Sequence, residues 1–251
     1  MQSKWIGGML GVCIAYAPML WADKLTDLTQ QAEHGDAAAQ SDLGTKYALG
    51  SGVAKDYQQA EKWFRTAAEQ GNPLAQYNLG LMYAHGEGLP INLKKAFNWF
   101  LKAAERGNVP AQFNIGLMYA NGHGVTRHYE EGFKWFHKAA EGGYSLAQVD
   151  LGLIYLRGEG IAKNPDEAAK WFKQSAQQGN PIAQYQLGLC YLDGVGVTKD
   201  DEEAYVWFAL AAAQGNDSAH EFLDELETEL THKQIADAQK RAALWQTAVL
   251  H

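Results

Sequence analysis

The chain has 251 residues, of which 47% are hydrophobic, so it is long enough for one large or two ordinary folded domains. Its 21 Lys and Arg against 29 Asp and Glu give a net charge of -8. This composition excludes a disordered protein, and it argues against nucleic acid as a partner because phosphate binding requires a basic face.

The first 22 residues have the features of a secretory signal peptide. Lys4 precedes an uncharged apolar stretch, and Ala22 supplies a small residue for cleavage. An uncleaved membrane anchor is the alternative, because Trp5 to Ala22 spans 18 residues and just reaches spanning length. A lipoprotein signal at Cys13 fits less well, since apolar sequence continues after it. Cleavage after Ala22 leaves Cys190 as the one cysteine, with no internal disulfide and no stable membrane insertion.

The next segment, residues 23–35, predicts a single helix that caps the first repeat. From there the chain repeats itself: "AQYNLGLMYAHGEGL" at residues 75–89 returns as "AQFNIGLMYANGHGV" at residues 111–125. The marker glutamines lie 36 residues apart, at Gln40, Gln76, Gln112, Gln148 and Gln184. This period predicts five stacked units, 36–71, 72–107, 108–143, 144–179 and 180–215.

Each unit is predicted to be two antiparallel helices. Ala75, Leu79 and Tyr83 form one helical stripe, and the Ala and aromatic residues around Trp99 and Phe100 form the second. Asn before Pro marks helix starts at residues 72, 164 and 180, and glycines mark the ends of the second helices, at Gly71, Gly107, Gly143, Gly179 and Gly215. The "GxG" pairs between the helices are interpreted as turns, because no strand precedes them and no phosphate-loop motif is complete.

Two further positions repeat inside the helices. A glycine recurs in the middle of every first helix, where it costs helix propensity and therefore predicts close helix approach, at Gly44, Gly80, Gly116, Gly152 and Gly188. A Trp followed by Phe recurs in every second helix, at Trp63, Trp99, Trp135, Trp171 and Trp207. Strict repetition favours a role for these Trp residues in the core over an aromatic ligand cage.

The motif A-Q-x-x-L-G-x-x-Y, then G-x-G, then A-x-x-W-F-x-x-A-A-x-x-G resembles the Sel-one-like repeats, a branch of helical repeats related to tetratricopeptide repeats. The resemblance covers residues 36–215, with departures at Ile115, Gly132 and Ser175. It implies an all-α, right-handed α-solenoid that scaffolds protein complexes, and exported bacterial members resemble periplasmic or surface binding proteins. One branch, associated with β-lactam binding, carries a cysteine pair in each repeat, and this chain lacks those cysteines.

After the fifth unit, residues 216–251 predict a half-repeat and a capping helix. Residues 217–230 begin like a sixth unit and then lose its Gly and Tyr. Thr231 and Gln234 form a capping-box pattern at the start of a last helix, which we expect to shield Phe222, Leu223 and Leu226.

The letters that change between repeats point to a binding surface. On the first helices, two positions seven residues apart share a face and differ from unit to unit. One row contains Asp42, Asn78, Asn114, Asp150 and Gln186, and the other contains Leu49, His85, Asn121, Arg157 and Asp193. A neighbouring row contributes the aromatic residues Tyr77, Phe113 and Tyr185. Because first helices line the concave groove in related repeats, these rows are candidates for holding an extended peptide. The alternative is that the Asn and Asp row satisfies turns of neighbouring repeats and that the aromatic residues are core between repeats.

The sequence favours a non-catalytic scaffold in the periplasm, with secretion or surface attachment as alternatives. His123, His128 and His137 match no metal motif, Cys190 stands where other units have Lys, Met or Ile, and no cofactor motif is complete. The expected partner is a protein or peptide. An extracytoplasmic regulator of a membrane sensor is an alternative, as is an enzyme acting on cell-wall peptides or β-lactams.

Overall fold

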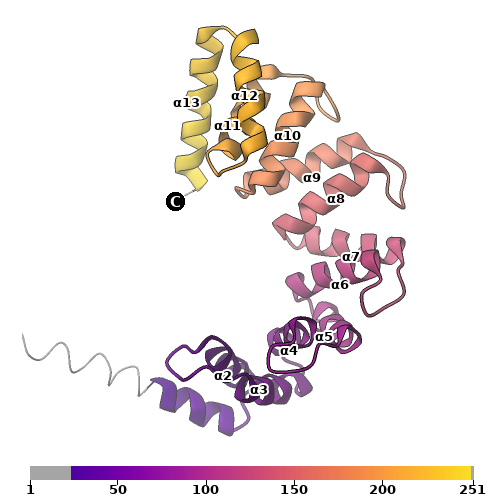
Figure 1. The fold of residues 1–251 in the computed structure, drawn as a ribbon, viewed down its shortest axis with the longest axis vertical. Helices are drawn as coiled ribbons and strands as arrows, with labels where there is room; N and C mark the ends of the chain where they lie inside the picture. The colour runs from indigo at the N-terminus through magenta and orange to yellow at the C-terminus, as the bar shows by residue number, and fades with distance from the viewer. Residues whose placement is uncertain (1–23, 250–251) are drawn as a thin grey trace, which may run out of the picture. The chain divides into compact units, whose positions relative to one another are not determined.

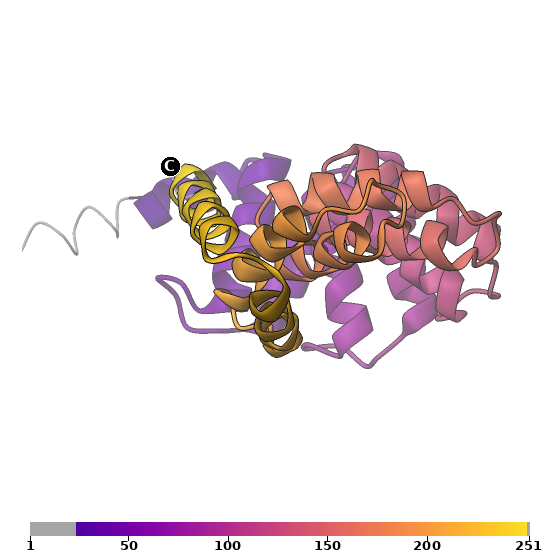
Figure 2. The ribbon, with the colours of Figure 1, turned by 90° about the horizontal axis from the view of Figure 1, so that it is seen from above.

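A computed structural model describes residues 24–249, and within this range all regular structure is helical (Figure 1, Figure 2). The predicted signal peptide, residues 1–22, lies outside the described residues. The chain divides into two compact units between Asn108 and Val109. No helix within residues 24–249 combines the length and apolar character needed to cross a membrane.

The first unit begins with a helix over residues 24–33, followed by two helix pairs. The pairs are α2 (Ala37–Leu49) with α3 (Tyr57–Glu69), and α4 (Pro73–His85) with α5 (Leu93–Glu105). The second unit has three pairs and two final helices. These are α6 (Val109–Asn121) with α7 (Tyr129–Glu141), α8 (Ser145–Arg157) with α9 (Pro165–Gln177), α10 (Pro181–Asp193) with α11 (Asp201–Ala212), then α12 (Asp217–Glu229) and α13 (His232–Val249).

The helix boundaries follow the predicted signals. Asn72 and Asn180 are the N-caps of α4 and α10, and each precedes a proline in the first turn. The five glycines after the second helices have positive φ, between 82° and 90°. Asn164 caps α9, and its backbone N–H donates to the Tyr155 carbonyl at 2.9 Å, which closes the turn between the helices of that pair. Local sequence therefore sets the boundaries of these helices, whereas α8 begins after Tyr144 without a side-chain cap.

Four of the five marker glutamines join a repeat to the helix that precedes it. Gln40 is buried, and its side-chain amide donates to the carbonyl of Ala32, eight residues earlier, at 2.9 Å. Gln76, Gln148 and Gln184 make the same bond to Ala68, Ala140 and Ala176. The acceptor carbonyl lies in the last turn of the preceding helix, where the regular i+4 donor is missing and the N–H of the glycine three residues later donates to it at 3.0 to 3.1 Å. The glutamine amide is a further donor to the same carbonyl. This explains why glutamine recurs at the position.

The helical glycines allow a phenylalanine ring to lie against the first helix. A Cβ atom placed on Gly152 would lie 2.5 Å from the ring of Phe172, and the four equivalent glycines give 2.6 to 2.8 Å to Phe64, Phe100, Phe136 and Phe208. The predicted close approach is confirmed. The contact that requires glycine is the ring of the Phe that follows each Trp.

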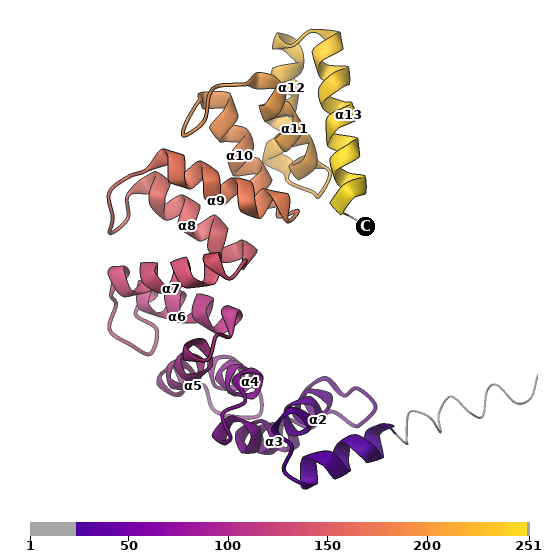
Figure 3. The same cartoon turned by 180° about the vertical axis from the view of Figure 1, so that it is seen from behind.

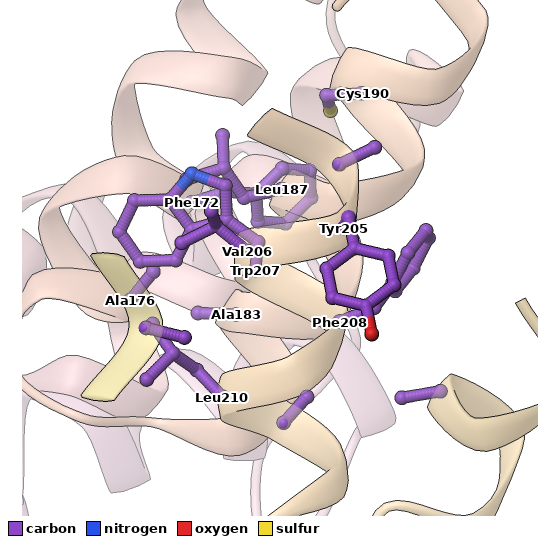
Figure 4. Packing of buried hydrophobic residues seen from close by; sticks show 14 of the residues in the cluster. Phe172, Ala176, Ala183, Leu187, Cys190, Tyr205, Val206, Trp207, Phe208 and Leu210 are labelled. Carbon is purple, nitrogen blue, oxygen red and sulfur yellow. The ribbon is translucent and has the colours of Figure 1, made fainter. Parts of the chain in front are cut away.

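The core of the second unit is made of these Phe rings and the Leu and Ala stripes. Phe172, Leu187 and Phe208 are completely buried, and Figure 4 shows them packed together with Trp207 and Leu210. The Trp residues contribute less than predicted. Trp207 is 4% exposed, but Trp63, Trp99, Trp135 and Trp171 are only half-buried. The side chains at the Trp positions therefore form the edge of the core in four of five repeats.

The final helices cover the end of the second unit, where Phe222 and Leu223 are half-buried. The Thr231 N–H donates to Gln234 Oε1 at 3.0 Å, and the Gln234 N–H donates back to Thr231 Oγ1 at 3.4 Å, which is a capping box. Leu226 is 1% exposed, and α13 packs along α11 (Figure 3). The indole of Trp245 lies 5.4 Å from that of Trp207, so α13 accounts for the greater burial of the fifth Trp.

Candidate interaction site

The first predicted row lies on the first helix of each pair and is partly accessible. Asp42 is exposed, whereas Asn78, Asn114, Asp150 and Gln186 are half-buried. No side-chain hydrogen bond is found for Asn78 or Asn114 within residues 24–249. Both amides are therefore available to a ligand, and neither contributes a bond to the fold.

The second row stands at the end of the same helices, and all of its members are exposed. His85, Asn121, Arg157 and Asp193 are the last residues of α4, α6, α8 and α10. Leu49 is 72% exposed at the corresponding end of α2. The left-handed glycine after each of them turns the chain away, which leaves these side chains at the rim of the helix pair.

The aromatic row makes packing contacts with the second helices. Tyr77 lies 5.6 Å from the ring of Phe100, and Phe113 lies 5.7 Å from Phe136. Tyr185 contacts Phe208 and also Phe222 of α12, at 5.8 and 6.0 Å. All three rings are half-buried, so one side of each belongs to the core and the other remains accessible.

In the second unit the structure brings three of the predicted residues into one hollow. Asn121, Asp150 and Arg157 line a cavity of about 170 Å³ between α6, α7 and α8. Its walls are mostly apolar, and they include three aromatic rings from α7 and two aliphatic side chains of α8, namely Tyr129, Phe133, Phe136, Leu153 and Ile154. Asp42, Asn78 and His85 belong to the first unit, and Gln186 and Asp193 lie elsewhere in the second.

The hollow places a carboxylate in a poorly solvated position. Burial raises the pKa of Asp150 from 3.8 to about 6, and the charge of Arg157 lowers that pKa in part. Arg157 also pairs with Glu159 at 3.4 Å. No hydrogen bond to the Asp150 carboxylate is found within the described part of the chain. An acceptor beside aromatic rings is suited to a ligand that brings a cation on an apolar stem.

Sequence reasoning missed the wall of the hollow contributed by α7. Tyr129 is 49% exposed, and Phe133 lies one turn further along the helix. The equivalent residues in the other four repeats are Tyr57, Leu93, Pro165 and Asp201 for Tyr129, and Glu61, Phe97, Ala169 and Tyr205 for Phe133. Both positions vary between repeats, so a row-by-row comparison of the second helices would have found them.

His128, His137 and Cys190 have structural roles, and His123 is exposed. His128 is the N-cap of α7, where its Nδ1 accepts from the Glu131 N–H at 3.4 Å. His137 pairs with Glu141 and lies edge-on to Trp171. Burial raises the pKa of Cys190 to about 11, as expected for a core residue and not for a nucleophile. Within residues 24–249, no three His, Cys, Asp or Glu side chains are grouped so that they would hold a metal ion.

Comparisons with known proteins agree with the repeat architecture. The family model described as Sel1 repeat matches the chain five times, at residues 37–72, 73–108, 109–144, 145–180 and 181–216. A Sel1 repeat protein from Oxalobacter formigenes is 32% identical, with a TM-score of 0.76 over 90% of this chain and 93% of that one. Comparison with curated proteins found no match.

Two further solved structures share the fold. A protective antigen present in uropathogenic Escherichia coli strains, which displays an SLR fold, is 28% identical with a TM-score of 0.59. That match covers 92% of this chain and 59% of the antigen. A Sel1 repeat protein from Klebsiella pneumoniae is 25% identical with a TM-score of 0.50, over 81% of this chain and 99% of that one.

Proposed function

The chain belongs to the Sel1 repeat family, whose members are typically protein-interaction scaffolds, and we propose that it binds a protein or peptide partner in the bacterial cell envelope without catalysing a reaction. The partner contacts the variable rows on the first helices. The observation that carries this proposal is the hollow in the second unit, where Asn121, Asp150 and Arg157 converge.

The chemistry of the hollow suggests what it recognises. The Asp150 carboxylate has no hydrogen bond there, and the rings of Tyr129, Phe133 and Phe136 surround the same space. A Lys or Arg side chain of a bound peptide would satisfy the carboxylate and place its stem and charge against the rings. Within the same unit as the hollow, the half-buried Asn114 offers an amide to a peptide backbone, and Asn78 offers one on the first unit by itself.

Crosslinking and affinity capture from the native envelope test this proposal. We expect Asp150→Asn to reduce capture of the specific partner about tenfold, which is the size of one lost charge-assisted bond. Asn98→Ala serves as a control because Asn98 is exposed on α5, outside both rows. Equal capture by Asp150→Asn and by the control would refute the role of the hollow.

The first-helix rows have a separate test. Asn78→Ala combined with Asn114→Ala is expected to weaken partner capture while the melting temperature stays nearly unchanged, since neither side chain makes a hydrogen bond to any of the described residues. A lower melting temperature of the double variant would show that these two residues have a structural role. A double variant that folds and captures the partner normally would show that the partner binds another face of the protein.

Export is the second part of the proposal. The apolar stretch ending at Ala22 is expected to be removed, so protein recovered from the periplasm or medium lacks residues 1–22. Intact mass or N-terminal sequencing measures this directly. A membrane-bound species that retains Met1 would instead support an anchor.

Absence of catalysis is the third part. The purified protein is expected to turn over neither reporter lactams nor peptidoglycan fragments. Turnover that survives stringent purification and disappears on a single substitution would contradict a purely binding role.

A further inference from the structure

The second helices of the pairs, such as α3 and α5, form another surface. In the first unit this surface contains a groove that is open to solvent. It lies between the end of α3 and the second half of α5, with a volume of about 430 Å³, and its lining includes Gly71, Gln76, Trp99, Lys102, Glu105 and Arg106. These positions are separate from the rows on the first helices. The groove is therefore a second candidate surface, distinct from the one in the proposed function.

The equivalent groove in the second unit is partly covered by the chain itself. Three repeats later, Gly179, Gln184, Leu210 and Gln214 line a hollow of about 390 Å³. Its remaining wall comes from Trp245 and Gln246 of α13. The protein thus contains one example of a helix placed on this kind of groove.

The contacts of α13 show how such a helix binds. Ala238 and Ala242 are buried where α13 packs along α11, and Trp245 reaches Trp207. Trp99, the equivalent of Trp207, is half-buried, and its ring carries the Lys102 ammonium at 4.2 Å from the centroid. Leu210, the equivalent of Lys102, is 3% exposed. The same repeat position therefore holds the apolar Leu210 beneath α13 and the cationic Lys102 in the open groove.

A buried acceptor in the open groove lacks a donor. In three repeats a second glutamine donates its side-chain amide to the Oε1 atom of the marker glutamine. Gln70 donates to Gln40, Gln178 to Gln148, and Gln214 to Gln184, at 2.7 to 2.8 Å. For Gln76 the residue equivalent to these donor glutamines is Arg106. The Arg106 guanidinium lies over Gly71 and makes no bond to Gln76. Gln76 is 2% exposed, and its Oε1 has no hydrogen-bond partner. A buried acceptor left in this state favours a ligand that supplies a donor.

We propose that the groove between α3 and α5 is a docking site for an amphipathic helix of a partner protein, bound as α13 is bound on the second unit. An aromatic side chain of that helix packs on Trp99 after Lys102 moves aside. A side-chain amide next to it donates to Gln76 Oε1. A carboxylate on the helix rim pairs with the Arg106 guanidinium, for which no hydrogen bond is found within the described residues.

The probe for this site is a synthetic peptide with the sequence of residues 231–249, because α13 is the helix that the equivalent groove accepts. It is titrated into the purified, isotope-labelled protein, and the side-chain signals of Trp99 and Gln76 are followed by NMR. We expect both signals to shift together and to saturate. A peptide carrying Trp245→Ala is expected to bind about tenfold more weakly, as for loss of a central aromatic anchor.

Two substitutions in the protein change the affinity in opposite directions. Lys102→Leu copies the covered groove and is expected to strengthen peptide binding about tenfold, since the cation no longer occupies the Trp99 face. Arg106→Gln supplies the missing donor from within the chain, as Gln214 does, and is expected to weaken binding about fivefold. Lys94→Leu is the matched control, an exposed lysine on the same helix outside the groove.

Three outcomes would overturn the proposal. The first is the absence of saturable shifts at Trp99 and Gln76 even in Lys102→Leu. The second is an equal gain in affinity from Lys94→Leu, which would indicate general hydrophobic adhesion. The third is a shift confined to Trp207, which would mean that the peptide only exchanges with α13. Thermal melts of each variant establish that the protein is folded in every titration.

Discussion

Trp135 and Phe136 are neighbours in the sequence but have different surroundings. Phe136 is 4% exposed and its ring lies against Gly116, whereas Trp135 is half-buried and carries the Lys138 ammonium 4.2 Å from its ring centroid. Adjacent residues on a helix point about 100° apart, so only one of the two can face the first helix fully. The repeated Phe is therefore the main core residue.

This difference predicts unequal costs of truncation. Phe136→Ala is expected to lower the free energy of unfolding by about 3 to 5 kcal/mol, because it leaves a cavity in the core. Trp135→Ala is expected to cost roughly half as much, since part of the indole is already in water. Urea denaturation of both variants measures the difference. A Trp135 variant as unstable as the Phe136 variant would contradict the assignment.

Asp150 predicts a dependence of stability on pH. Its pKa is about 6 in the folded protein against an ordinary value of 3.8, so the folded state holds the proton more tightly. The stabilisation by protonated Asp150 is present below pH 3.8 and is lost as the pH rises to 6. Above that pH the ionised form costs up to about 3 kcal/mol, an upper bound because the group is partly solvated.

Asp150→Asn removes this cost. The variant is expected to be more stable than the parent by about 1 to 3 kcal/mol at about pH 7.5, and the advantage is expected to disappear near about pH 3.5. Urea denaturation at a series of pH values follows the difference. An advantage that stays constant across the series would show that the carboxylate is not destabilised by burial.

At the scale of the element, the N-caps of the second helices differ in quality. Asp56, Asn92, Asn164 and Asp200 accept backbone N–H groups with a side-chain oxygen, at 2.8 to 3.2 Å. In α7 the cap is His128, whose ring nitrogen accepts at 3.4 Å. The third repeat therefore begins its second helix with the weakest cap of the five.

We expect His128→Asn to stabilise the protein by about 0.5 to 1 kcal/mol, because asparagine is among the best N-cap residues. The reverse exchange, Asn164→His in α9, is a matched control and is expected to cost a similar amount. Both are measured as shifts in the denaturation midpoint. If the two exchanges change stability in the same direction, cap quality is not the cause.

The helix boundaries that were predicted correctly are determined by residues that are close to one another in the sequence. Asn72 followed by Pro73, and Thr231 with Gln234, mark helix starts within a few residues of sequence, and the structure confirms both. The hollow around Asp150 was harder to predict because its wall combines α7 with α6 and α8. Which side of Phe133 faces a cavity depends on how these helices pack, and that information is not local.

At the scale of the whole molecule, the repeat period gives no sign of the division into two units. The spacing of 36 residues continues unchanged from Gln76 to Gln112, across Asn108 and Val109. The fold class and the number of repeats were predictable because every unit has the same length. The compact units depend on contacts between helices, which a strictly periodic sequence does not distinguish.

The final helix belongs to the second unit and stabilises it. Truncation after Leu230 removes α13, exposes Trp207, and is expected to lower the stability of the second unit by about 3 kcal/mol or more, as for loss of a large buried aromatic contact. A red shift of tryptophan fluorescence and faster amide exchange in α11 would report the change. Unchanged exchange in α11 would show that α13 adds little.

The glutamine bonds between repeats have a consequence for how such a chain varies in length. Each bond runs from a marker glutamine to a carbonyl eight residues earlier, so it joins the end of one repeat to the start of the next. Unequal recombination between two copies adds or removes whole repeats and recreates this junction every time. An insertion of a few residues between the acceptor alanine and the glutamine shifts the amide away from its acceptor. Duplication of residues 144–179 is therefore expected to give a longer folded protein, whereas a shorter insertion at Tyr144 is expected to be purged by selection.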